Sequence, residues 1–85
     1  MRKAVIVDDE PYIVEHLTHA IDWNGFQLEI GYAATSSVKA LEYVLANPVS
    51  IVITDIAMPD MDGLSLIQRI KEAKPYIYEI GRASC

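Results

Sequence analysis

The chain has 85 residues and a formal net charge of −5, with 7 lysines and arginines against 12 aspartates and glutamates. Hydrophobic residues make up 52% of it, which excludes an intrinsically disordered chain, and the length allows one domain at most. The acidic balance disfavours direct nucleic-acid binding and favours a small cation, and no apolar run is long enough to cross a membrane. The single Cys85 excludes an internal disulfide and indicates a cytoplasmic protein.

The first half of the chain predicts two strands separated by a helix. A β-branched run within residues 3–8 is apolar on both faces and ends on acids, as buried strands of parallel sheets do. Apolar residues then recur at helical spacing over residues 11–22, with Pro11 in the first turn, where a helix tolerates it. Over residues 26–32 apolar and polar residues alternate, which predicts a half-buried edge strand.

The second half repeats this arrangement. Hydroxyl residues that can act as N-caps precede an apolar stripe, which predicts a helix over residues 36–46. A second fully apolar, β-branched run over residues 50–55 again ends on an acid. After a loop that contains proline, a third helix is expected over residues 63–73, ending before Pro75.

Alternating strands and helices predict an α/β fold with a parallel sheet. The two fully apolar strands are expected in its interior, so the three strands, numbered along the chain, take the spatial order 2-1-3. In a doubly wound sheet of this order a switch point lies between strands one and three, at their carboxyl ends. We expect a ligand site there.

Acids occupy the predicted switch point. Asp8 and Asp9 end the first strand and Asp55 ends the third, so three carboxylates should meet in one crevice. Carboxylates this close together repel, and a hard divalent cation such as Mg²⁺ relieves the repulsion. Asp55, the lone acid at its strand end, is the expected phosphoryl-accepting nucleophile. The alternative is that residues 8–10 only cap the helix that follows.

Residues 5–11, VIVDDEP, and residues 55–63, DIAMPDMDG, closely resemble the receiver domain of bacterial two-component response regulators. The resemblance implies a flavodoxin-like fold and a phosphoryl group accepted from a sensor histidine kinase on Asp55. It also implies that Asp9 and Asp55 bind Mg²⁺ directly, that Asp8 assists through water, and that Ala57 donates its backbone carbonyl. The segment Ile21-Asp22-Trp23 resembles the subgroup with an AraC-type output domain.

The same resemblance implies a truncated receiver, with its N-terminal part over residues 1–78. Residues 79–85, EIGRASC, resemble a translated sequencing-library adapter, so we expect a non-native tail, with a divergent fourth strand over residues 76–80 as the alternative. The third strand would then be an exposed edge and folding marginal. The family's switch residues, which follow strands four and five, would be absent, DNA would be bound only through a missing C-terminal output domain, and a dimer of the full-length protein stays open.

Two rival functions remain beside the phosphoacceptor receiver. A Mg²⁺-dependent phosphatase or phosphotransferase with an aspartyl nucleophile would need a second acid two residues after Asp55, where Ala57 stands. A non-functional fragment without the switch elements is the other alternative. We expect a signalling domain rather than an enzyme.

Overall fold

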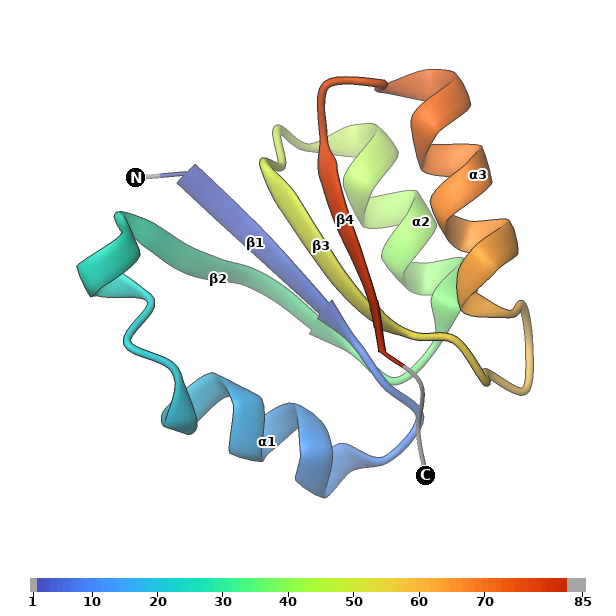
Figure 1. Cartoon of the computed structure of the whole chain (residues 1–85). Coiled ribbons are helices and arrows are strands. Elements are labelled where there is room, and N and C mark those ends of the chain that lie inside the picture. Colours follow the sequence, from blue (N-terminus) through green and yellow to red (C-terminus); the bar gives the residue numbers. More distant parts are fainter. Residues whose placement is uncertain (1, 83–85) are drawn as a thin grey trace.

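Strands and helices alternate along residues 2–82, the part of the chain that the computed structural model describes (Figure 1). In chain order the elements are β1 (Arg2–Val7), α1 (Pro11–Ala20), a short 3-10 helix η1 (Asn24–Phe26), β2 (Leu28–Ala34), α2 (Ser37–Ala46), β3 (Ile51–Asp55), α3 (Gly63–Ala73) and β4 (Tyr78–Arg82). The predicted α/β fold class is confirmed.

The strands form one parallel sheet in the order β2-β1-β3-β4. The predicted order 2-1-3 of the first three strands is confirmed, and β1 and β3, which carry the two apolar runs, lie inside the sheet. Val7 of β1 lies opposite Thr54 of β3. This register brings the carboxyl ends of the two strands to the same edge of the sheet.

Strand β4 (Tyr78–Arg82) agrees with the alternative of a fourth strand over residues 76–80, which was not the favoured expectation. It pairs with β3 along its whole length, from Tyr78 opposite Ile51 to Arg82 opposite Asp55. The prediction that β3 is an exposed edge is therefore wrong, because the weak apolar alternation after residue 76 still forms a parallel strand. The pairing does not bear on the origin of residues 79–85, which stays a prediction, and residues 83–85 lie outside the described part.

The bounds differ most from the prediction around η1 and at the end of β2, which is Ala34 rather than residue 32. Helix α1 ends at Ala20 rather than at residue 22, and β2 begins at Leu28 rather than at residue 26. Gln27 has a φ of 58°, in the left-handed region, and its N–H donates to the Asn24 carbonyl. This tight turn uses residues that the alternating pattern assigns to the strand.

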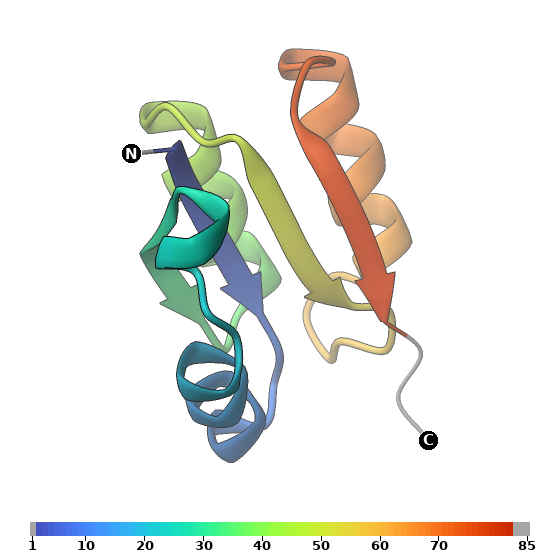
Figure 2. The ribbon, with the colours of Figure 1, turned by 60° about the vertical axis from the view of Figure 1, so that its left-hand side comes forward.

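Helices cover both faces of the sheet, with α2 and α3 side by side on one face and α1 on the other (Figures 1 and 2). Successive residues of a strand point to opposite faces. Val5 and Val7 accordingly pack in the cluster with α2 and α3, while Ala4 and Ile6 pack in the cluster with α1. No helix within residues 2–82 is both long and apolar enough to span a membrane.

Helix α1 covers only part of the sheet face on which it lies. Ile53 of β3 belongs to the α1 cluster and is buried. Ile80 lies opposite Ile53 in the β3–β4 pair, yet it is 47% exposed, and Tyr78 on the same strand is 76% exposed. The outer part of this face, over β4, is therefore open to solvent.

Two leucines of α3 test the packing described above. Leu66 is fully buried against the sheet, whereas Leu64 is 63% exposed. Leu66→Ala should lower the free energy of unfolding by about 2–5 kcal/mol, because it leaves a cavity beneath α3. Leu64→Ala deletes the same atoms from the exposed face and should change it by less than about 0.5 kcal/mol. Urea denaturation measures both, and equal losses would contradict this orientation of α3.

Candidate functional site

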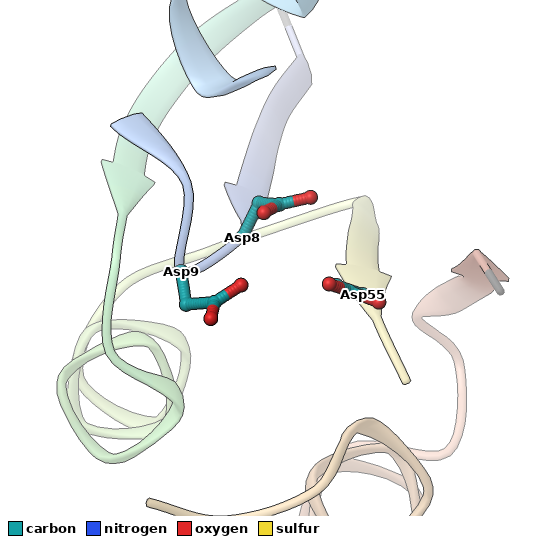
Figure 3. A group of neighbouring side chains, drawn as sticks. All are labelled: Asp8, Asp9 and Asp55. Atoms are coloured by element: carbon teal, nitrogen blue, oxygen red, sulfur yellow. The ribbon is translucent and has the colours of Figure 1, made fainter. Parts of the chain in front are cut away.

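Three carboxylates meet at the carboxyl edge of the sheet (Figure 3). Asp8 and Asp9 follow directly after β1, and Asp55 is the last residue of β3. Each offers a carboxylate oxygen, and these oxygens lie within 4.8 Å of one another. The structure thus brings together the three acids that the sequence predicts to meet, and the parallel pairing of β1 with β3 is the reason.

Asp8 is the most constrained of the three acids. It is 3% exposed, its Oδ1 accepts a hydrogen bond from the Glu10 N–H at 2.9 Å, and its Oδ2 lies 3.3 Å from Nη1 of Arg82. Burial raises the pKa of Asp8, and the charges of Asp55 and Asp9 act in the same direction. The Glu10 N–H and the Arg82 guanidinium oppose this rise without cancelling it.

Asp55 is also 3% exposed, and the loop that follows orients it. Its Oδ1 accepts a hydrogen bond from the Ala57 N–H at 3.2 Å. Its Oδ2 has no hydrogen-bond partner among residues 2–82. The carboxylate is therefore fixed through one oxygen, while the other stays available to a ligand.

Gly63 lies against the backbone of the same loop. Its N–H donates to the Ile56 carbonyl at 2.7 Å, which closes the loop at its base. A Cβ at this position would collide with the Asp55 carbonyl oxygen and would lie 2.8 Å from the Ile56 Cα. Glycine is required here because the start of α3 approaches the end of β3 so closely.

The donors at this edge suit a hard divalent cation. Every side chain of the described cluster offers a carboxylate oxygen, and the three negative charges are close enough to repel. Mg²⁺ binds through one or two carboxylates, keeps several waters and accepts phosphate oxygens at open sites. Ala57, the predicted carbonyl donor, is exposed two residues after Asp55. These residues therefore fit Mg²⁺.

Two side chains near this edge were not predicted from the sequence. Arg82 ends β4 and reaches Asp8, but it falls in the segment assigned to a tail, so no pattern pointed to it. Asp60, in the loop between β3 and α3, accepts hydrogen bonds from residues 36–38, which are 22 to 24 positions away. No local sequence signal indicates a contact across that separation.

Comparison with known proteins identifies the family. The response regulator receiver domain matches residues 4–80. An uncharacterized response regulatory protein of Staphylococcus epidermidis is 39% identical over 72 residues, which cover 85% of this chain and 29% of that protein. The uncharacterized transcriptional regulatory protein YesN of Bacillus subtilis is 32% identical over 77 residues, 91% of this chain and 21% of that protein. The chain therefore spans less than a third of these two relatives.

Solved structures agree with this match. The REC domain of the response regulator AraT from Geobacillus stearothermophilus has a TM-score of 0.89 at 38% identity, over 94% of this chain and 62% of that one. TrrA of Thermotoga maritima in complex with Mg(2+)-BeF has a TM-score of 0.77 at 32% identity, over 88% and 63%. TrrA in complex with the histidine kinase ThkA has a TM-score of 0.84 at 30% identity, over 99% and 70%. Fold, acidic edge and relatives agree, and the chain belongs to the response regulator receiver domain family.

Proposed function

We propose that this receiver domain accepts a phosphoryl group on Asp55 from the phosphohistidine of a sensor histidine kinase. The observation that carries the proposal is the convergence of Asp55 with Asp8 and Asp9 at the carboxyl edge of the sheet. In the proposed site Asp9 and Asp55 bind Mg²⁺ directly, Asp8 acts through water, and Ala57 contributes its carbonyl oxygen. When bound, Mg²⁺ screens the negative charge of the incoming phosphoryl group.

The transfer makes one bond and breaks one. An oxygen of Asp55 bonds to phosphorus, while the phosphorus–nitrogen bond of the phosphohistidine breaks and the histidine nitrogen keeps the electron pair. The Ala57 N–H holds Oδ1 of Asp55, which leaves Oδ2 for the attack. Burial keeps bulk water away from the proposed nucleophile, because Asp55 is 3% exposed.

Relatives support the kinase and the cation as partners. TrrA was solved with Mg(2+)-BeF and with the histidine kinase ThkA, and this chain is 32% and 30% identical to it in the two structures. The name of YesN includes transcriptional regulation. This name agrees with the resemblance of residues 21–23 to the AraC-type subgroup. We propose that the whole protein works in the cytoplasm and binds DNA through an AraC-type output domain outside this chain. A dimer of that protein stays a prediction.

The phosphatase alternative is not favoured. It needs a second acid two residues after the nucleophile, and Ala57 has no ionisable side chain. In the structure Ala57 offers its N–H to Asp55 and no proton donor to a leaving group. The family match concerns a signalling domain and supports phosphoryl acceptance instead.

Replacing the proposed nucleophile tests the assignment. With Mg²⁺ and a small phosphodonor, the chain should gain one phosphoryl group, which intact-mass spectrometry detects. Asp55→Asn should reduce labelling to background, because the amide cannot form the acyl phosphate. Asp62→Asn, the same change at the exposed cap of α3, should label normally. Chelation of Mg²⁺ should stop labelling, whereas labelling that persists in Asp55→Asn would refute the assignment.

The raised pKa of Asp8 predicts a pH-dependent stability of the metal-free chain. Because the pKa is raised above 3.8, ionisation is easier in the unfolded state, and stability falls as pH rises from 3.8 through the folded-state pKa. Asp8→Asn should therefore be more stable than the parent at pH 7 in a chelator, with no such advantage below pH 3.8.

Thermal unfolding across this pH range measures the effect, with Asp9→Asn as the matched control. Asp9 is exposed at the same strand end, so its replacement should gain less stability at pH 7. If Asp8→Asn is less stable than the parent at pH 7, the ion pair with Arg82 stabilises the chain by more than burial of the charged Asp8 carboxylate destabilises it. That result would contradict the prediction.

A further inference from the structure

Asp60 joins the loop between β3 and α3 to the start of α2. Its Oδ2 accepts hydrogen bonds from the Ser36 hydroxyl at 2.7 Å and from the Val38 N–H at 3.1 Å, and its Oδ1 accepts one from the Ser37 N–H at 3.3 Å. The Ser36 hydroxyl oxygen in turn accepts from the Lys39 N–H at 3.3 Å. The first three N–H groups of α2 thus all have acceptors, two of them on Asp60.

This contact differs from an ordinary N-cap. Asp62 caps its own helix, α3, by accepting from the Ser65 N–H at 2.7 Å. Asp60 instead places its charge at the N-terminus of another helix, where the macrodipole favours an anion. Desolvation raises the pKa of Asp60, but the hydrogen bonds from Ser36 and from nearby backbone N–H groups outweigh it and lower the pKa to about 2. Asp60 is therefore ionised at neutral pH.

The contact holds the loop that follows Asp55. At its base the loop is closed by the hydrogen bond between Gly63 and Ile56. Farther out, Asp60 fastens it to α2, which lies beside α3 on the same face of the sheet (Figure 1). Ala57 lies between these two attachments and bonds through its N–H to Asp55. Met58 of the same loop is buried in the core cluster, and Asp60 adds the hydrogen bonds that tie the loop to the start of α2.

We propose that Asp60 is a positioning residue of the phosphoacceptor site: by capping α2 from the β3–α3 loop, it fixes the Ala57 carbonyl relative to Asp55. The inference rests on the proposed function, in which that carbonyl is a donor to Mg²⁺. Asp60 touches no reacting atom and acts only through the loop. Removing an outer residue that orients a metal ligand typically weakens metal affinity by about tenfold or more.

Two variants of Asp60 test the inference in the whole chain. Asp60→Ala should weaken Mg²⁺ binding by about tenfold in calorimetric titration, because the loop loses its outer attachment. Hydrogen exchange should become faster at the amides of residues 56–60. Asp60→Asn keeps one acceptor oxygen and should fall between the parent and Asp60→Ala in both measurements. If Asp60→Ala does not fold, Asp60→Asn decides the matter.

Matched controls separate position from charge and from helix stability. Asp62→Ala removes the same charge and a helix cap from the same loop, but no hydrogen bond to α2 among residues 2–82. Its Mg²⁺ affinity should stay within about twofold of the parent, as expected for an exposed charge. Ser36→Ala should show part of the Asp60→Ala effect, because the hydroxyl contact is lost. Ser37→Ala removes a buried hydroxyl without a partner among the described residues and should leave both measurements unchanged.

The outcomes distinguish the inference from the function on which it rests. A parent chain that binds no Mg²⁺ would refute the proposed function together with this inference. A parent that binds Mg²⁺ while Asp60→Ala matches it in affinity and in loop exchange would overturn the inference alone. Equal losses of affinity in Asp62→Ala and Asp60→Ala would also overturn it, since charge would then explain the effect.

Discussion

The parallel pairing of β1 with β3 is the constraint on which the rest of the structure depends. With Val7 opposite Thr54, the chain continues into Asp8 beside β3, which ends in Asp55. Alternate residues of β1 point to the two helix layers and contribute to both core clusters. A slip of one residue would turn the apolar side chains to the wrong faces and separate the acids. Core and site therefore depend on one set of backbone hydrogen bonds.

The fold keeps the three carboxylates of the acidic edge close together, although their negative charges repel. Burial raises the pKa of Asp8, and the neighbouring charges of Asp55 and Asp9 add to the rise. Arg82 relieves only part of this cost, because its side chain is 39% exposed and water screens the pair. The buried apolar residues of the two clusters supply the stability that keeps the carboxylates together. A divalent cation would convert this unfavourable arrangement into a favourable one.

Much of this arrangement could be predicted from the sequence, because its signals are local. Two buried strands that each end on an acid indicate both the strand order and the meeting of Asp8 with Asp55. The rest depends on contacts without a local pattern. Strand β4 is short and weakly alternating, and its pairing with β3 provides the support that its composition does not indicate. The contact between Asp60 and Ser36 spans 24 positions and is created only by the packing of α2 beside α3.

The central claim, that the fold gathers carboxylates from β1 and β3 to hold one divalent cation beside Asp55, is tested most directly by NMR. Mn²⁺, a paramagnetic substitute for Mg²⁺, would be added in small amounts to the isotopically labelled chain. Amide signals of Asp9, Ile56 and Ala57 should broaden first, while Arg2 at the opposite edge of the sheet stays sharp. Equal broadening at exposed acids on the helices would contradict the claim, as at Glu15, Glu42 and Glu72.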